Sequence, residues 1–193
     1  MSRRQLYVLV PCFYTLMALA AVAWRRLAHL PLDARLWFAG CEPGAAVILG
    51  TAAAGVVLLV TELALHRRGW VDFLERSFRE LLGRVTVLRA LWLALLSSAG
   101  EELLFRGAMQ PTLGITAATV VFGLLHSGPD RRFLIWTGFA LAMGFLLGWL
   151  YDRTGGVLAP MLTHFLVNFH NLLDEDRVAM PPPWMRSRWD RAG

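Results

Sequence analysis

The chain has 193 residues, of which 56% are hydrophobic and 17% charged, and its mean hydropathy is +0.50. A soluble domain of this length rarely has so apolar a composition, so we expect a protein that crosses a membrane several times. The net charge of +5 does not indicate a nucleic-acid-binding protein, because the arginines gather at the ends of apolar runs and no basic patch alternates with aromatic residues.

Apolar runs of the length that a transmembrane helix needs, about 20 residues, recur along the chain. They predict an all-α, polytopic transmembrane bundle of about six helices that forms a single integral membrane domain, residues 1–193. The first run follows Arg3 and Arg4, and with the small residues at 21–23 it is also compatible with a cleaved signal peptide. The expected spans are 6–24, 44–65, 87–109, 115–127, 133–151 and 157–173.

The segment between the second and third spans has the pattern of an amphipathic helix. Apolar residues recur there at helical spacing, and the charged residues fall off that stripe. We expect this helix, residues 70–85, to lie on the inner membrane surface. The domain therefore divides into two spans plus the interfacial helix (1–86), a core (87–173) and a cytoplasmic tail (174–193).

The distribution of arginine predicts the orientation in the membrane. All nineteen basic residues are arginines, and cytoplasmic loops attract positive charge. With the N-terminus inside, thirteen arginines fall in inner segments and four in outer segments. Both termini are therefore expected in the cytoplasm.

The third expected span contains charges that an apolar helix does not normally carry. An ionisable side chain at bilayer depth costs about 2.5 kcal/mol or more, so it usually faces a partner or a water-filled cavity. Glu102 and Arg106 are one helical turn apart and can pair. Glu101 is rotated by about 100° from Glu102 around the helix, so it needs another partner.

Candidate partners for Glu101 lie on later helices. His164 and Asn168 share one face of the last span, and His126 ends the fourth. Counted at about 1.5 Å per residue from the outer helix ends, Glu101, His126 and His164 all lie roughly 12–18 Å deep. Taken singly, these histidines are typical of capping or packing residues and Asn168 of a hydrogen bond between helices. Together they indicate a site in the middle of the membrane.

These polar residues also form three ordered motifs, which resemble those of the CPBP family of intramembrane proteases. The family includes the CAAX-processing prenyl endopeptidases and bacterial bacteriocin-processing or immunity proteins. The resemblance covers residues 91–173, and the short chain is similar to the bacterial myxosortase-like branch. The motifs here are Glu101-Glu102-x-x-x-Arg106, Phe122-x-x-x-His126 and His164-x-x-x-Asn168.

The resemblance implies an endopeptidase that cleaves a membrane-anchored protein near its C-terminus, within the lipid bilayer of a bacterial inner membrane. Amide hydrolysis requires an activated water, a stabilised oxyanion and a proton for the leaving amine. On this basis Glu101 is the expected base, His126 holds the same water, and His164 and Asn168 donate to the oxyanion. Glu102 and Arg106 are expected to support these groups.

Two questions stay open at this level. Glu101, His126 and His164 also match the ligand set of a catalytic zinc ion, although their spacing is not the H-E-x-x-H of familiar zinc proteases. We favour a site without metal or other cofactor. A transporter or scaffold that uses the same buried Glu and His groups without cleaving a peptide is the rival function.

Overall fold

The computed structural model describes residues 3–64, 85–128, 130–131 and 133–178, and these residues form helices and no strands. The all-α class is therefore confirmed, and each of the six expected spans is helical. The expected interfacial helix lies outside the described residues except for Val85, and so does most of the tail. The helices are α1 (Arg3–Leu27), α2 (Arg35–Phe38), α3 (Pro43–Ala64), α5 (Val87–Glu102), the π-helix η1 (Leu103–Met109), α6 (Gln110–Leu125), α7 (Phe133–Thr154) and α8 (Leu158–Val178).

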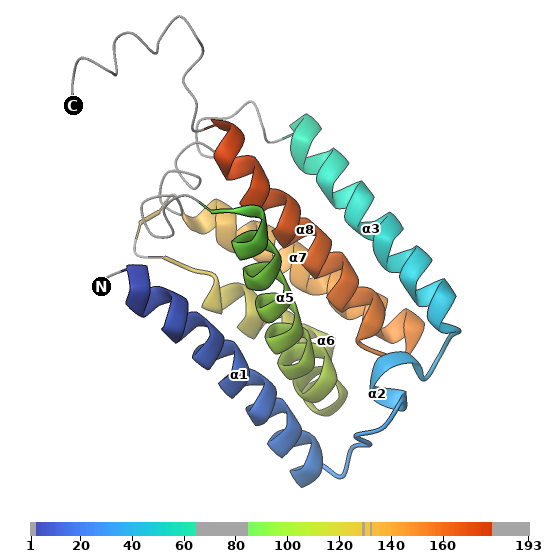
Figure 1. Cartoon of the computed structure of the whole chain (residues 1–193). Coiled ribbons are helices and arrows are strands. Elements are labelled where there is room, and N and C mark those ends of the chain that lie inside the picture. The colour runs from blue at the N-terminus through green and yellow to red at the C-terminus, as the bar shows by residue number, and fades with distance from the viewer. Residues whose placement is uncertain (1–2, 65–84, 129, 132, 179–193) are drawn as a thin grey trace, which may run out of the picture.

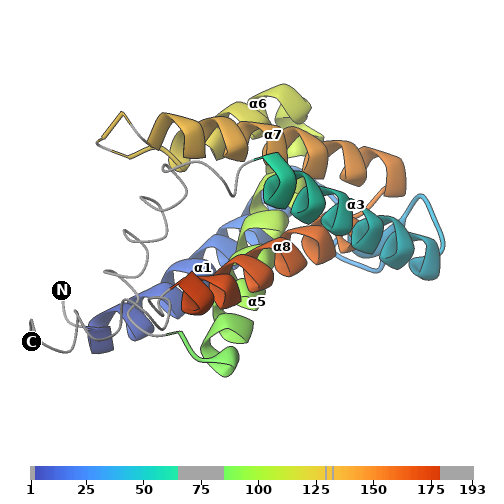
Figure 2. The same ribbon diagram turned by 90° about the horizontal axis from the view of Figure 1, so that it is seen from above.

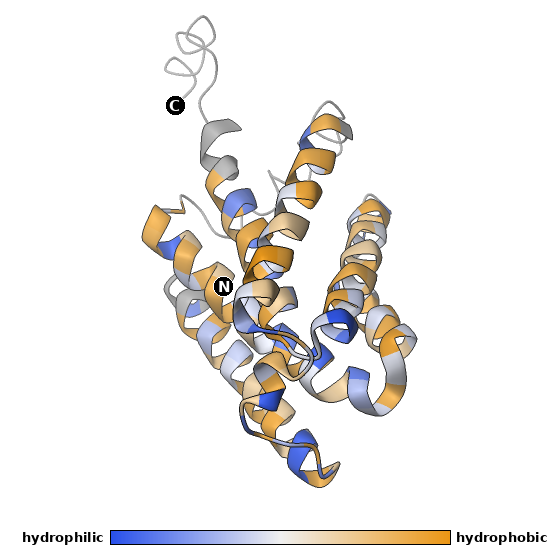
Figure 3. Ribbon diagram, turned by 90° about the vertical axis from the view of Figure 1, so that its right-hand side faces the viewer, coloured by the Kyte–Doolittle hydropathy of each residue, from blue (hydrophilic) through white to orange (hydrophobic). Residues whose placement is uncertain are grey.

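Several of these helices are long and apolar enough to cross a bilayer. They provide four such stretches, namely Val8–Leu27, Pro43–Leu63, Val87–Leu125 and Phe133–Thr154. Most of the ribbon is apolar (Figure 3), and large side chains such as Ile48 and Leu63 are more than 70% exposed, as expected for residues that face lipid. The chain is therefore an integral membrane helix bundle.

The stretch Val87–Leu125 contains two of the expected spans. The structure joins them without a loop, because η1 continues α5 and α6 follows directly. The reversal occurs at Gly114, whose φ of 85° and ψ of 163° are not helical. Only glycine adopts such a conformation readily. The bend turns α6 back so that it packs along α7.

The packing of the helices places α5 between α1 and α8 (Figures 1 and 2). The helix α8 also packs against α3 and α7. The approach of α3 to α8 is close, since the Thr163 hydroxyl donates a hydrogen bond of 2.8 Å to the carbonyl of Gly50. The helix α1 begins and α8 ends at the same end of the bundle (Figure 1).

The short helix α2 closes the other end of the bundle, over the turn between α7 and α8. Backbone hydrogen bonds join Ala39 to Gly155 at 3.2 Å and Leu36 to Val157 at 2.9 Å. Arg35, the first residue of α2, hydrogen bonds to Asp33 in the preceding loop and lowers the pKa of that carboxyl to about 2. Local polar contacts thus order the loop that holds α2 in place.

Candidate active site

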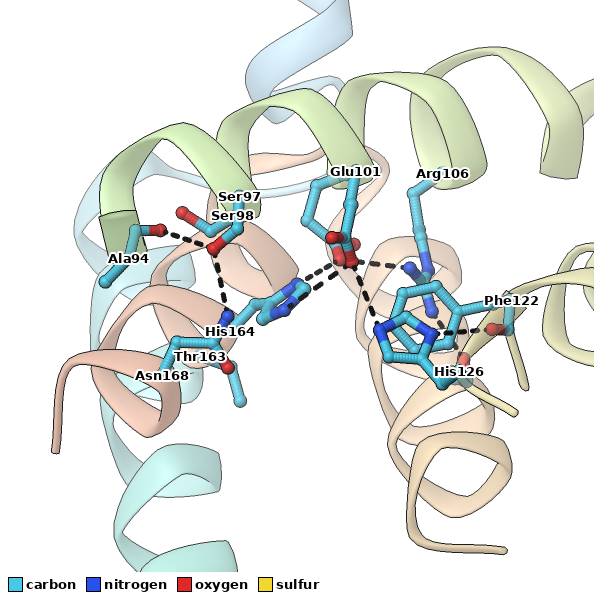
Figure 4. A network of polar contacts seen from close by, with 12 residues as sticks. Ala94, Ser97, Ser98, Glu101, Arg106, Phe122, His126, Thr163, His164 and Asn168 are labelled. Carbon is cyan, nitrogen blue, oxygen red and sulfur yellow. Dashed lines mark hydrogen bonds and ion pairs between the residues drawn. The ribbon is translucent and has the colours of Figure 1, made fainter. Parts of the chain in front are cut away.

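The buried charges at the junction of α5 and η1 form the pair that the sequence predicts. Arg106 Nη1 donates to Glu102 Oε1 at 3.0 Å, and both side chains are 0% exposed. The guanidinium also donates to the carbonyl of Gly144 at 3.0 Å, and its carbon atom lies 4.6 Å from the ring centre of Phe122 (Figure 4). Arg106 therefore ties α5 and η1 to α6 and α7.

His164 contacts the same carboxylate, which the sequence did not predict. Its Nδ1 lies 2.7 Å from Glu102 Oε1. Because Glu102 pairs with Arg106, it is a carboxylate and can only accept, so we assign the hydrogen to Nδ1 of His164. The other ring nitrogen, Nε2, faces Glu101 Oε2 at 3.9 Å.

His126 has a comparable arrangement at the end of α6. Its Nδ1 lies 2.7 Å from the carbonyl oxygen of Phe122. A carbonyl can only accept, so this nitrogen also carries the hydrogen. The Nε2 atom of His126 then faces Glu101 Oε2 at 3.8 Å.

Three polar atoms thus converge, as Figure 4 shows from close by: Glu101 Oε2 and the Nε2 atoms of His126 and His164. With both histidines neutral, all three are hydrogen-bond acceptors. Glu101 Oε2 is buried and has no hydrogen-bond partner among the described residues. Because facing acceptors repel one another, this cluster requires a hydrogen-bond donor or a cation.

The charges around the cluster indicate where an extra proton belongs. Glu101 and Glu102 with the single charge of Arg106 sum to −1, and a buried net charge is costly. His164 faces both carboxylates, Glu102 at 2.7 Å and Glu101 at 3.9 Å. A proton on Nε2 of His164 makes the buried group neutral and turns this nitrogen into a donor.

The chemistry of the three converging residues suits zinc as well as water. Ligands of a tetrahedral zinc ion are about 3.3 Å apart, whereas the carboxylate oxygen is 3.8 Å and 3.9 Å from the two nitrogens. Among the described residues, no three His, Cys, Asp or Glu side chains are grouped closely enough to hold a metal ion. A zinc site would therefore require these side chains to move together.

Asn168 lies one turn beyond His164 on α8, and its amide is anchored to α5. Its Nδ2 donates to Ser97 Oγ at 3.0 Å, and Ser97 in turn donates to the carbonyl of Ala94 at 3.2 Å. One hydrogen of the Asn168 amide remains for another acceptor. The sequence analysis missed Ser97, although its place four residues before Glu101 put it on the same helix face.

The side chains of the cluster differ in exposure. The side chain of Glu101 is 9% exposed and that of His164 is 6% exposed, whereas that of His126 is 23% exposed. The cluster is thus most open beside His126. A further contact comes from α1, where the side chain of Tyr14 lies against Gly100, the residue before Glu101, and no pattern in the sequence indicated it.

Comparison with known proteins identifies relatives of the part of the chain that holds this cluster. Residues 83–170 match the family described as type II CAAX prenyl endopeptidase Rce1-like. The uncharacterized protein YpbD of Bacillus subtilis is 31% identical over 90 residues, which are 47% of each chain. This chain therefore covers about half the length of that curated relative, and no solved structure matches. The matched segment includes Glu101, His126, His164 and Asn168, and excludes α1 and α3.

Proposed function

We propose that this chain, whose residues 83–170 match the Rce1-like family of type II CAAX prenyl endopeptidases, is an intramembrane protease of the CPBP family that hydrolyses a peptide bond near the C-terminus of a membrane-anchored protein. The observation that carries the proposal is the convergence of Glu101 Oε2 with the Nε2 atoms of His126 and His164, at 3.8 Å and 3.9 Å. A buried carboxylate oxygen that has no hydrogen-bond partner among the described residues and faces two imidazoles is suited to bind and deprotonate one water molecule.

In the first step, the water donates one hydrogen bond to Glu101 Oε2 and the other to Nε2 of His126. Both atoms are acceptors, because the Nδ1 hydrogen of His126 is committed to the Phe122 carbonyl. A lone pair of the water then attacks the carbonyl carbon of the substrate. Glu101 takes the proton, the new carbon–oxygen bond forms, and the carbonyl oxygen becomes an oxyanion.

The oxyanion requires donors that are in place before charge develops. Protonated His164 supplies Nε2–H, held in orientation by its bond of 2.7 Å to Glu102. Asn168 supplies its remaining amide hydrogen from the next turn of α8. Loss of one such donor typically lowers the rate by about 10²–10³-fold.

In the second step, the tetrahedral intermediate collapses and the carbon–nitrogen bond breaks. Glu101 returns its proton to the leaving amine, so the base is restored and the products are a carboxylic acid and an amine. Glu102 and Arg106 take no proton in this scheme. Glu102 accepts from Nδ1–H of His164 and so fixes the orientation of the ring, and Arg106 joins η1 to α7 through the Gly144 carbonyl.

The proposed mechanism uses no metal or other cofactor. If zinc were present, Glu101, His126 and His164 would hold it, and it would polarise water as a Lewis acid. We favour the mechanism without metal because the spacing of the three groups is wider than that of zinc ligands, and because the protein itself supplies base and oxyanion donors.

The proposal is tested by intact-mass analysis of membrane-anchored proteins in cells that carry wild type, Glu101→Gln or His164→Ala. We expect precursors to accumulate with both variants, each extended at the C-terminus by the same segment. The matched control is His170→Ala, an exposed histidine on the same helix, which should process normally. Membrane levels of each variant are compared by immunoblot.

Unchanged processing in both site variants, at normal membrane levels, would reject the protease. Such a result would favour a transporter or scaffold that uses the same buried groups, and ion flux in liposomes would then distinguish these two.

A further inference from the structure

The helix α1 lies outside the matched segment, yet it contacts the residue proposed as the base. The side chain of Tyr14, a half-buried residue of α1, lies against Gly100, the residue next to Glu101, and interacts electrostatically with the Glu101 carboxylate. Oε2 of Glu101 faces the two histidines and has no partner among the described residues.

The backbone of α1 is brought to this position by the absence of a side chain at Gly100. A Cβ atom there would lie 2.9 Å from the backbone oxygen of Tyr14 and 3.1 Å from its Cβ. Such distances are too short for carbon atoms that are not bonded. The residue next to Glu101 thus has to be glycine for α1 to approach this closely.

A second contact holds α1 in register along α5 and η1. The Arg25 guanidinium, at the far end of α1, is 3% exposed and donates to the backbone carbonyl of Gly107. The two contacts, at Gly100 and Gly107, lie on opposite sides of the carboxylates along the chain. The position of Tyr14 relative to Glu101 is therefore fixed at both ends.

We propose that the Tyr14 hydroxyl donates a hydrogen bond to Oε1 of Glu101 and thereby positions this carboxylate, so that a helix outside the matched segment completes the site. The inference rests on the proposed function. A carboxylate with one oxygen bound to a phenol and the other free cannot rotate without breaking the bond. The hydrogen bond from Tyr14 thus keeps Oε2 directed at the water site between His126 and His164.

The test uses Tyr14→Phe, which removes the hydroxyl and keeps the ring against Gly100. The purified full-length protein is assayed on the precursor that accumulates in Glu101→Gln cells. We expect kcat to fall about 10-fold or more, because misplacement of a catalytic group is costly, with KM unchanged, because Tyr14 does not touch substrate. The matched control is Phe13→Leu, which alters a neighbouring ring that is 58% exposed and should leave both constants unchanged.

A spectroscopic measurement gives a readout that packing alone would not change. The carboxylate band of Glu101 is identified as the infrared difference between wild type and Glu101→Gln. Tyr14→Phe should shift this band, and Phe13→Leu should not.

A double-mutant cycle tests whether the close approach of α1 at Gly100 acts on catalysis through the Tyr14 hydroxyl. Gly100→Ala should displace α1 and lower kcat in the wild-type background, and have little further effect on kcat when combined with Tyr14→Phe. If Tyr14→Phe keeps full kcat and an unshifted band while Glu101→Gln is inactive, the positioning role is wrong and the protease stands. If Glu101→Gln itself is active, both proposals fail.

Discussion

At the scale of single residues, one oxygen of Glu102 connects the proposed chemistry to the stability of the bundle. Glu102 Oε1 accepts from Arg106 at 3.0 Å and from His164 at 2.7 Å. The guanidinium also lies over the Phe122 ring, whose own carbonyl binds His126. The two histidines are thus held in orientation through neighbouring groups that touch Arg106.

Arg106→Met should strongly destabilise the protein, because it leaves the Glu102 carboxylate buried beside only His164. Removal of one partner of a buried ion pair costs about 3–5 kcal/mol. We expect a loss of this size in SDS-induced unfolding of the detergent-solubilised protein. The double variant Glu102→Gln with Arg106→Met has no unpaired charge and should recover part of the loss. A double variant less stable than Arg106→Met would contradict the pairing.

Activity should survive removal of metal ions. The proposed mechanism needs only the protein's own groups around Glu101, His126 and His164, so dialysis against a strong chelator should leave cleavage of the accumulated precursor unchanged. The metal content of the purified protein is measured in parallel. Loss of activity with the chelator, restored by added zinc, would show that these three residues are metal ligands.

At the scale of elements, the bend at Gly114 determines where α6 places His126. A side chain at this φ of 85° and ψ of 163° is strained, since this region costs other residues about 1–3 kcal/mol. Gly114→Ala should therefore lower the free energy of unfolding by about that amount and reduce cleavage by displacing α6. Gly138→Ala is the matched control, because Gly138 is helical and a Cβ there meets no atom within 4 Å. Equal effects of the two substitutions would show that the bend is not strained.

The elements also show what the sequence could predict and why the rest escaped. The longer spans were recognisable because about 20 apolar residues suffice to identify one. The π-helix η1 was not recognisable, because its backbone bonds span five residues, as from Gln110 N–H to the Phe105 carbonyl, and no side-chain pattern specifies that spacing. The bend at Gly114 was anticipated as a helix end. The sequence did not indicate that α5, η1 and α6 follow one another without a loop.

The same limit applies to the site. The depth of Glu101, His126 and His164 could be counted along each span, and the structure brings these three together. Contacts between helices depend on which helix faces pack together, and a single sequence does not specify this packing. The bond from Asn168 to Ser97 and the contact of Tyr14 with Gly100 were missed for this reason.

At the scale of the whole molecule, the arrangement of the helix ends agrees with termini on one side of the membrane (Figure 1). The arginine distribution predicts that this side faces the cytoplasm. Arg25, one of the few arginines assigned to the outer side, is 3% exposed and hydrogen bonds to the carbonyls of Pro31 and Gly107. Arg25 is thus paired inside the protein and adds no free positive charge to the outer loops. The excess of arginine in the inner loops over the outer loops is therefore larger than the sequence alone indicates.

Cys41, between α2 and α3, tests this orientation without a fusion partner. We expect a membrane-impermeant maleimide to label Cys41 in bacterial cells whose outer envelope has been removed and whose inner membrane is intact. The reason is that Cys41 is partly exposed and lies in a loop expected on the outer side. Cys12 lies within a membrane-spanning stretch, where lipid suppresses the reactive thiolate, so Cys41→Ser should abolish labelling. Ser127→Cys in that background, between α6 and α7, should react only after the membrane is permeabilised. The reverse pattern, in which Ser127→Cys reacts in unpermeabilised cells and Cys41 does not, would place both termini outside the cell. The arginine distribution would then have predicted the wrong orientation.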